Sequence, residues 1–328
     1  MKIKNVFLTY VFLLLFVNDV SAAKYSGKKI VFVNSNHQGY EWSDGILRGV
    51  KSVLDGTGVK LKVIDMDSKR NNEEFFKKKM ASQIKTTIDE FTPDLIIASE
   101  DNAVKYLVVP YYRHNYDIPV VFCGVKWSAS EYELPRANIT GVIEVALIPE
   151  LIDILEEFSK GNRIGILGTD DYSNSKEAKI FKDKFGIVLK EEVFVSDIQD
   201  WKKEFVRLQE SVDMLILAPF SILFINEDLS SLREIKEFVV KNTKIPTGTV
   251  EDWVAKFALI GIVKKADEQG ILAAKAALKI LDGVDPAEIP IAENEQGNLI
   301  LNLAVAEKLD VLFAPSLIRS AIIIDKEF

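Results

Sequence analysis

Polar and aromatic side chains gather in residues 34–42, a short stretch able to hold a small molecule. It contains Asn36, Tyr40 and Trp42, whose amide and rings can hydrogen-bond to a ligand and stack on it. The apolar run at 30–33 is typical of a strand, and apolar residues recur at helical spacing after the loop. In a parallel α/β sheet such a loop lies at the carboxyl end of its strand, where open α/β folds bind ligands. The alternative is an ordinary strand-to-helix connection with chance aromatic residues.

A second polar loop follows the apolar run at 94–98 and is expected at the same sheet edge. It contains Ser99, Asp101 and Asn102. These residue types are preferred at helix N-caps, so the simplest alternative is that they only begin a helix. The two interpretations are compatible, because the N–H groups at a helix N-terminus also bind anions.

The sequence lacks the residue patterns that enzyme catalysis, nucleotide binding and metal binding require. A hydrolase is the main enzymatic alternative, but the only histidines are His37 and His114, and neither lies near a nucleophile-elbow motif. Cys123 has no recognisable catalytic partner. The glycines within 165–168 lack the third glycine of a dinucleotide fingerprint, and the acidic turn at 65–72 lacks the glycine of a calcium loop. We therefore expect no enzyme activity, no cofactor and no metal.

Length and charge narrow the class of protein further. The 328 residues are 48% hydrophobic, enough for a large core and for two domains rather than one. Lys and Arg number 41 against 49 Asp and Glu, a net charge of -8. Neutralising phosphates needs clustered cations, so this balance argues against a nucleic-acid partner.

Residues 1–23 are predicted to be a secretory signal peptide. Two lysines precede a largely apolar run at 6–17, and small residues follow at the cleavage positions. An uncleaved anchor is the weaker alternative, because the run is shorter than the ~20 apolar residues of a spanning helix. The only cysteine, Cys123, lies far from this segment, so no lipid-anchor cysteine follows it. We expect a soluble exported protein in a bacterial periplasm.

Apolar runs of strand type alternate with amphipathic helical patterns along the rest of the chain. This alternation predicts an α/β fold with parallel sheets and helices on both faces, one sheet in each half. The order restarts after 139–143, and the tail beyond 253 is too short for a third domain, so it is expected to cross between the halves. The expected strands are 30–33, 61–65, 94–98, 119–122, 139–143, 163–167, 187–195, 213–217, 289–291 and 299–301.

The chain resembles the ABC-transporter substrate-binding family of the type I periplasmic fold, which includes relatives used as sensor regions of histidine kinases. The resemblance covers roughly residues 28–324. It rests on the stretches 33–42, 97–103, 121–125, 270–283, 289–290, 301–302 and 306–309.

This resemblance implies two flavodoxin-like lobes joined by crossing segments, with the ligand buried between them on closure. The expected first lobe is 24–141 plus about 254–284, and the second is 142–253 plus about 285–328.

The resemblance also implies that loops of both lobes contact the ligand. The candidates are rich in carboxylates and aromatic rings and poor in Arg and Lys, which favours an amino acid or another amine-bearing solute. Its carboxylate would be met by N–H groups at helix starts. In the alternative interpretation, half of these acids face water or cap helices. The candidate ligand-binding residues are Asn36, Tyr40, Trp42, Ser99, Asp101, Asn102, Phe122, Gly124, Glu144, Thr169, Asp170, Tyr172, Phe220, Ser221, Glu251 and Trp253.

Two partners remain open for such a protein. The first is the permease of an ABC importer, to which a monomeric binding protein would deliver its solute. The second is a histidine kinase or other membrane receptor, for which the chain would be the ligand-sensing partner. Besides these two binding functions, a hydrolase is a third and the weakest alternative.

Overall fold

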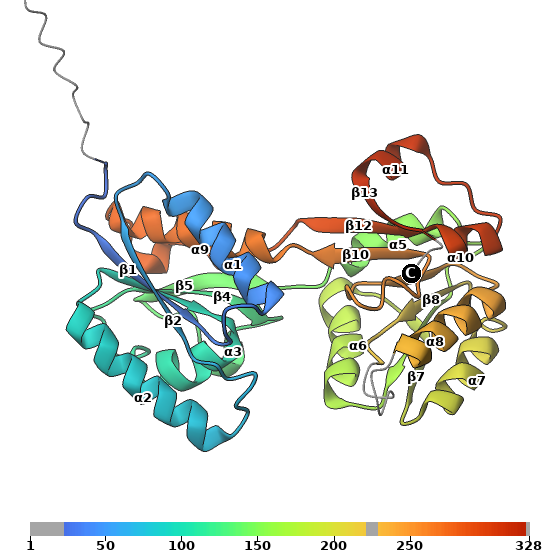
Figure 1. Cartoon of the computed structure of the whole chain (residues 1–328), viewed down its shortest axis with the longest axis horizontal. Coiled ribbons are helices and arrows are strands. Elements are labelled where there is room, and N and C mark those ends of the chain that lie inside the picture. The colour runs from blue at the N-terminus through green and yellow to red at the C-terminus, as the bar shows by residue number, and fades with distance from the viewer. Residues whose placement is uncertain (1–22, 221–228, 326–328) are drawn as a thin grey trace, which may run out of the picture.

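The computed structural model describes residues 23–220 and 229–325. They form two lobes, each built on its own sheet and separated along the long axis of the molecule (Figure 1). The α/β class predicted from the sequence is confirmed, with parallel pairing dominant in both sheets. The predicted signal peptide lies outside the described residues apart from Ala23.

The first sheet has six parallel strands in the order β11-β5-β4-β3-β1-β2. Its strands are β1 (Lys29–Asn34), β2 (Lys60–Asp65), β3 (Leu95–Ser99), β4 (Val120–Lys126), β5 (Ile139–Glu144) and β11 (Ala292–Glu293). The helices of this first lobe are α1 (Glu41–Leu54), α2 (Glu74–Phe91), α3 (Glu100–Ala103), the π-helix η1 (Val104–Val108), α4 (Val109–Tyr111), the 3₁₀ turns η2 (Ser130–Tyr132) and η4 (Pro286–Glu288), and α9 (Ala266–Leu281).

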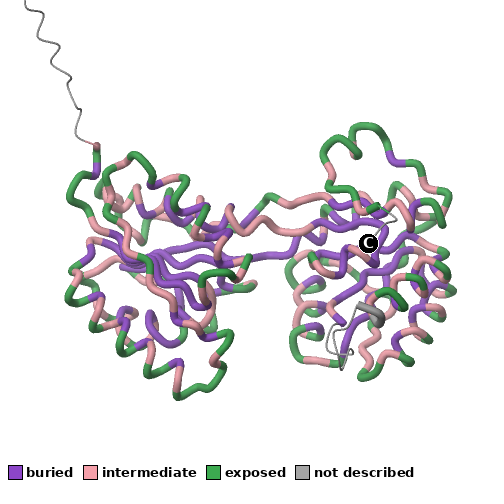
Figure 2. Tube along the Cα trace, in the orientation of Figure 1, coloured by how far each residue is buried: buried purple, intermediate pink, exposed green. Residues whose placement is uncertain are grey.

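Different helices cover the two faces of this sheet, because successive side chains of a strand point to opposite faces. Ile30 and Phe32 of β1 share a core with α1 and α9. Val31 and Val33 share another core with α2 and η1. Figure 1 shows α1 and α9 on one side of the sheet and α2 on the other, and the strands between them are buried (Figure 2). The near-continuous apolar run of β1 therefore reflects burial on both faces.

Helices α1 and α9 pack together at very short range, and two glycines allow it. A Cβ atom at Gly270 of α9 would lie 1.9 Å from the carbonyl oxygen of Ile46. A Cβ atom at Gly49 of α1 would lie 2.0 Å from the carbonyl oxygen of Asp267. Since α1 begins at Glu41, at the end of the polar loop, this contact sets the position of that loop against the start of α9.

The second sheet has seven strands in the order β13-β12-β10-β9-β8-β6-β7, and only β10 and β12 pair antiparallel. Its strands are β6 (Ile164–Thr169), β7 (Leu189–Val195), β8 (Met214–Leu217), β9 (Thr247–Thr249), β10 (Ile260–Lys264), β12 (Gly297–Asn302) and β13 (Ala321–Ile324). The helices of this second lobe are α5 (Ile148–Glu156), α6 (Tyr172–Phe185), α7 (Ile198–Leu208), α8 (Leu229–Asn242), α10 (Leu303–Lys308) and α11 (Pro315–Ser320).

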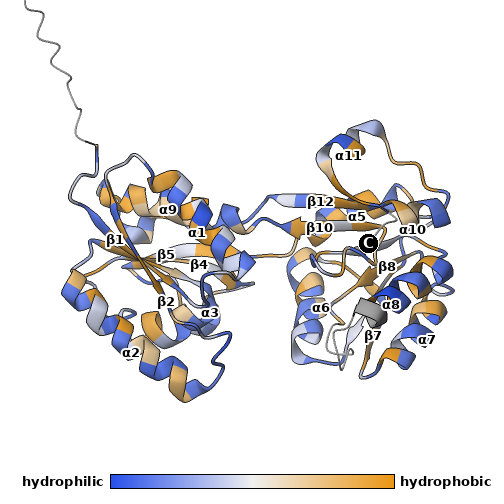
Figure 3. Ribbon diagram, viewed as in Figure 1, coloured by the Kyte–Doolittle hydropathy of each residue, from blue (hydrophilic) through white to orange (hydrophobic). Residues whose placement is uncertain are grey.

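The second lobe has the same layered arrangement as the first. Ile166 of β6 shares a core with α5 and α6. Leu167, the next residue along, shares a core with α7 and α8 on the opposite face. Hydrophobic residues concentrate on the strands and on the helix faces turned toward them (Figure 3).

The chain crosses between the sheets three times, and the later crossings differ from the expected ones. Strand β10 pairs with β9 in the second sheet, although 254–284 was assigned to the first lobe. Strand β11 pairs with β5 in the first sheet, although 285–328 was assigned to the second lobe. Such short strands carry too little local pattern to reveal their partner, because partner choice depends on distant residues.

The first turn of α9 holds all three crossings in place. The Gln269 side chain accepts from the Gly124 N–H and donates to the Asn294 side chain and to the Ile143 carbonyl, at 2.9, 3.1 and 3.2 Å. Asn294 in turn accepts from the Val145 N–H and donates to the Val145 carbonyl. These buried amides leave few polar groups unsatisfied, so the crossings form a defined hinge rather than loose linkers.

Candidate functional site

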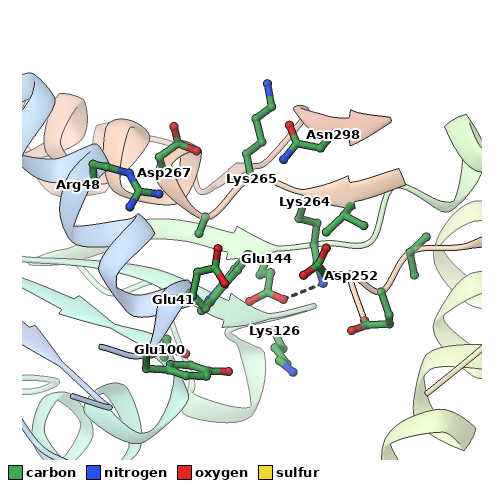
Figure 4. Close-up of a pocket in the computed structure, with 16 residues that line it drawn as sticks. Glu41, Arg48, Glu100, Lys126, Glu144, Asp252, Lys264, Lys265, Asp267 and Asn298 are labelled. Atoms are coloured by element: carbon green, nitrogen blue, oxygen red, sulfur yellow. Dashed lines mark hydrogen bonds and ion pairs between the residues drawn. The ribbon is translucent and has the colours of Figure 1, made fainter. Parts of the chain in front are cut away.

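A cleft of about 650 Å³ opens between the two lobes beside the crossings (Figure 4). Its walls come from the carboxyl ends of β1, β3, β4 and β5 in the first lobe and of β9 and β10 in the second. This edge of each sheet is where open α/β folds bind ligands. The lining residues are Tyr40, Glu41, Trp42, Arg48, Glu100, Lys126, Glu144, Val250, Glu251, Asp252, Val263, Lys264, Lys265, Ala266, Asp267 and Asn298.

Glu100 is the acidic group of the first-lobe wall. It begins α3, and one of its carboxylate oxygens accepts hydrogen bonds from the Asn36 amide at 2.6 Å and the Ser43 hydroxyl at 2.9 Å. Burial raises the pKa of Glu100 from its ordinary 4.5 to about 7. Its backbone has φ +70°, a conformation that costs free energy in a non-glycine residue and concentrates at functional sites. The surrounding fold therefore holds a costly, largely uncompensated carboxylate at the cleft.

Replacing Glu100 by glutamine should make the protein more stable at high pH. Because the native pKa of Glu100 is raised to about 7, the native state binds more protons than the unfolded state between about pH 4.5 and 7. Stability therefore falls as pH rises through this window. We expect Glu100→Gln to raise the free energy of unfolding by about 1–3 kcal/mol at pH 8 and by almost nothing at pH 4, as measured by urea denaturation. Glu90→Gln, an exposed change on α2, is the control, and a pH-independent difference would contradict the prediction.

A buried ion pair lies at the hinge side of the cleft. The Lys264 ammonium of β10 contacts the Glu144 carboxylate of β5 at 2.8 Å, with side chains only 13% and 6% exposed. Burial by itself lowers the pKa of Lys264, but the carboxylates of Glu144, Glu251 and Glu177 outweigh it, so the pKa is raised and the lysine stays charged. The pair joins the ends of two crossing strands from different sheets (Figure 4).

The second-lobe wall carries Glu251, which follows β9, and Glu177 of α6 lies within electrostatic range of it. Burial raises the pKa of Glu177 to about 7, and the neighbouring Glu251 adds to the shift. Lys264 and Lys126 act in the opposite direction, so Glu177 lies within electrostatic range of the cleft-lining charges. Helix α6 is the helix of the second lobe that stands next to the first lobe (Figure 1).

Four of the predicted ligand-binding residues line the cleft, namely Tyr40, Trp42, Glu144 and Glu251. The two rings come from the first lobe, at the start of α1, and each has a lysine above it. The Lys69 ammonium lies 3.8 Å from the centre of the Tyr40 ring, and that of Lys264 lies 6.0 Å from the centre of the Trp42 ring.

Other predicted residues of the first lobe lie near the cleft but do not line it. Asn36 supports Glu100, whereas Asp101 accepts a hydrogen bond from the Tyr132 hydroxyl at 2.7 Å, and burial raises its pKa. The Asn102 amide donates to the Ser68 hydroxyl, and Ser99 is fully buried. All of these follow β1 or β3, as predicted.

Gly124 and Phe122 pack against neighbouring residues of the first lobe and do not line the cleft. Gly124 has φ +66°, and a Cβ atom there would lie 3.2 Å from the Glu100 side chain. The Phe122 ring lies in the core of the first lobe and touches Gly141, which corrects its assignment to the cleft. The pleat of β4 turns this ring toward the face of the sheet that α2 and η1 cover.

The predicted residues after β6 do not line the cleft. Thr169 donates to Asp171 and to the Pro219 carbonyl, each at 2.8 Å, so it stabilises the turn that begins α6. Asp170 is exposed, and Tyr172 is 81% exposed at the first turn of α6.

Of the residues predicted after β8 and β9, Phe220 lies in the core and Trp253 packs against it, so neither lines the cleft. Phe220 is fully buried and its ring centre lies 4.9 Å from that of Trp253, within an aromatic cluster that includes Trp201 and Phe257. This packing corrects the assignment of Phe220 to the cleft. Ser221 lies outside the described residues.

The cleft also contains cations and acids that the sequence did not single out. Arg48, Lys126, Lys264 and Lys265 line it, so it is not poor in basic groups as expected. Glu177, which is not among the lining residues, lies one helical turn beyond Asn174, too far from its strand to be chosen as a loop residue. An acid within the first turns of a helix that follows a strand was the available signal for it.

Among the described residues there is no group of three or more His, Cys, Asp and Glu side chains placed to hold a metal ion. No helix in residues 23–220 and 229–325 is long and apolar enough to cross a membrane.

Comparisons with known proteins match this geometry. The model of the family described as ABC transporter substrate binding protein matches residues 31–323. No curated protein matches the sequence.

Among solved structures, a ligand-free, open substrate-binding protein with adhesive properties from Clostridium difficile superposes with a TM-score of 0.71 and 18% identity, covering 92% of this chain and all of that one. A domain from Streptococcus pneumonia in complex with L-Trp gives 0.58 and 18%, covering 91% and 99%. A solute-binding protein from a Bradyrhizobium species with bound bis-tris gives 0.54 and 13%, covering 94% and 89%.

These likenesses establish the fold, which is that of type I periplasmic binding proteins. The family consists of solute-binding proteins rather than enzymes, and it normally acts outside the cytoplasm with an ABC transporter as partner. With the family model spanning residues 31–323, the chain belongs to the ABC transporter substrate-binding protein family.

Proposed function

We propose that this protein captures a small amino-group-bearing solute, such as an amino acid, between its lobes and delivers it to the permease of an ABC importer. The supporting observation is that carboxylates from both lobes and the hinge reach one cleft. Glu100 belongs to the first lobe, Glu144 to the hinge and Glu251 to the second lobe. A cationic nitrogen is the ligand group that several converging carboxylates stabilise most strongly.

Glu100 is the proposed partner of the ligand amine. One of its oxygens is held by Asn36 and Ser43, which are neutral donors and leave the negative charge uncompensated. The ligand carboxylate would meet Lys126, whose exposed side chain lines the cleft. Closure of the lobes removes water from these contacts and so strengthens each of them.

Tyr40 and Trp42 are the proposed stacking groups. Both rings line the cleft, and both already lie beneath a lysine ammonium, which shows that their faces accept a cation. An organic cation would stack on the Tyr40 ring in place of the exposed Lys69 ammonium, or on Trp42 beside the ion-paired Lys264.

The remaining parts of the proposal follow from the sequence. The protein would be exported through the signal peptide at 1–23, act in the periplasm and bind its solute as a monomer. Its function would be to present the closed, ligand-bound form to the importer.

Thermal-shift screening of the mature chain against amino acids, amines, sugars and nucleosides tests the proposal. At a hundredfold excess over its Kd, a true ligand should raise Tm by about 5 °C or more. Phosphate buffer is essential, because an amine buffer would compete for the same carboxylates. Titration calorimetry then gives the Kd of each hit. A shift with uncharged sugars alone would contradict the proposal.

A further inference from the structure

Helix α6 of the second lobe contacts the first lobe near both of its ends. Near its start, the Lys176 ammonium lies 3.9 Å from the Glu131 carboxylate of η2. Near its end, the Lys184 ammonium lies 2.5 Å from the Glu293 carboxylate of β11. The four side chains are 29–53% exposed, so water and salt screen both pairs and neither holds the lobes firmly. Figure 1 shows α6 on the side of the second lobe that faces the first.

A ring contact between these two ion pairs is better shielded from water. The Trp127 ring, which follows β4 in the first lobe, lies 6.0 Å from the Phe181 ring of α6, edge to face at 71°. Phe181 is only 1% exposed, in a core of the second lobe. Trp127 packs against that core and also against the first-lobe core beneath α2, and it is the only described residue that these two cores share. Through this indole the apolar interiors of the two lobes meet.

The backbone of Trp127 has an unusual conformation beside the cleft. Its φ is +64°, which costs free energy in a residue other than glycine and persists only where the surroundings enforce it. The Trp127 N–H donates to the Glu144 carbonyl at 2.8 Å, and the Glu144 side chain pairs with Lys264 at the hinge. Lys126, the preceding residue, lines the cleft. One turn of the chain therefore belongs to the cleft wall, to the hinge and to the contact with the second lobe.

Rotation of the lobes about the crossings must change this ring contact. The cleft opens between the lobes beside the crossings, so its width depends on the angle between them. A rotation that opens or closes the cleft moves α6 relative to Trp127, and the two rings lose their attraction as they separate. The contact therefore favours one angle between the lobes over the others.

We propose that Trp127 is an inter-lobe positioning residue, which packs against Phe181 and thereby sets the angle between the lobes and the width of the empty cleft. The inference goes beyond the proposed function and does not depend on which solute the cleft binds. Because every bound form requires a particular angle, a change at Trp127 alters the apparent affinity for all solutes by the same factor.

Dipolar electron-spin spectroscopy of the ligand-free mature protein tests the inference. Nitroxide labels at Lys79→Cys on α2 and Lys203→Cys on α7 occupy exposed positions on different lobes. The native Cys123 is fully buried, so the labels react with the two introduced thiols. We expect a narrow distance distribution in the labelled protein and one at least about twofold broader, with a shifted mean, after Trp127→Ala. Phe181→Leu, which removes the partner ring, should broaden the distribution in the same way.

Two matched variants make the result specific. Trp127→Phe keeps an aromatic ring at the junction and should restore most of the original distribution. Phe158→Ala removes a ring from an edge-to-face pair of the same kind, 5.5 Å from Phe313 within the second lobe, and should leave the inter-lobe distance unchanged. Thermal unfolding verifies that each variant is folded.

Salt separates the ring contact from the ion pairs of α6. In about 1 M NaCl, where charges are screened beyond about 3 Å, the distribution of the labelled protein should not change. Broadening at high salt equal to that of Trp127→Ala would assign the lobe angle to the ion pairs and overturn the inference.

Two other results would also overturn it. One is an unchanged distribution after Trp127→Ala, and the other is equal broadening after Phe158→Ala, which would indicate general loosening of the fold. Failure of every amine to bind would overturn the proposed function alone, because no ligand enters the distance measurement.

Discussion

Replacing Lys264 by methionine should lower the free energy of unfolding by about 3–5 kcal/mol. The substitution leaves the Glu144 carboxylate, only 6% exposed, without the ammonium that contacts it at 2.8 Å. An unpaired buried charge costs far more than the net contribution of the pair itself. Urea denaturation at pH 8 measures the loss.

Two further variants make this prediction specific. Lys265→Met alters the next residue, which also lines the cleft but forms no ion pair in the described part of the chain, and should change stability by less than about 0.5 kcal/mol. The double variant Glu144→Leu with Lys264→Met replaces both charges by apolar groups and should recover most of the loss. Equal stability of wild type and Lys264→Met at pH 8 would show that the pair is not buried.

Replacing Gly270 by alanine should lower the free energy of unfolding by about 2–3 kcal/mol. In an isolated helix this change is favourable by about 1 kcal/mol, so the expected sign is opposite to that of helix propensity. The added Cβ atom would lie 1.9 Å from the Ile46 carbonyl oxygen and 2.7 Å from the Val50 nitrogen. Both are backbone atoms, so relief requires α1 and α9 to separate.

The same substitution should also weaken ligand binding, because α1 begins at the cleft with Tyr40 and Trp42 and α9 begins at the second crossing. Denaturation measures the first effect and calorimetry with an identified ligand measures the second. Lys275→Ala, on the exposed side of α9, should leave both unchanged within about 0.5 kcal/mol. An increase in the stability of Gly270→Ala would mean that the helices are not in such close contact.

Glu100 illustrates why a binding site is costly for the fold. The glutamine variant is expected to be more stable at pH 8 and to bind an amine less well, since one buried carboxylate produces both effects. Such an exchange of stability for function is common at ligand sites. The two measurements on one variant are therefore informative together.

Several features of the protein could be predicted from the sequence because they depend on local pattern. The run at 30–33 is apolar at every position, which indicates a strand buried on both faces, and β1 occupies 29–34. The loops after β1, β3 and β5 were recognised from polar residues at the ends of such runs, and Tyr40, Trp42 and Glu144 do line the cleft. In each case the strand that precedes the loop determines where the loop lies.

Residues at strand ends were harder to assign because a loop position does not determine the direction of a side chain. Phe122 was expected at the end of its strand but lies within β4, and Phe220 follows β8; their rings are fully buried in two different cores. The direction depends on the pleat and on the helix packed beneath, both of which involve distant residues.

The sequence by itself determined the class of fold, the family and the sheet edge at which the cleft opens, because apolar periodicity and short motifs are local properties. Only the tertiary structure decided which charges meet in the cleft. Lys264 lies there because β10 joins the second sheet before the chain returns to the first. The polar and aromatic loop at 34–42 is one wall of a site whose charge balance depends on residues more than a hundred positions away.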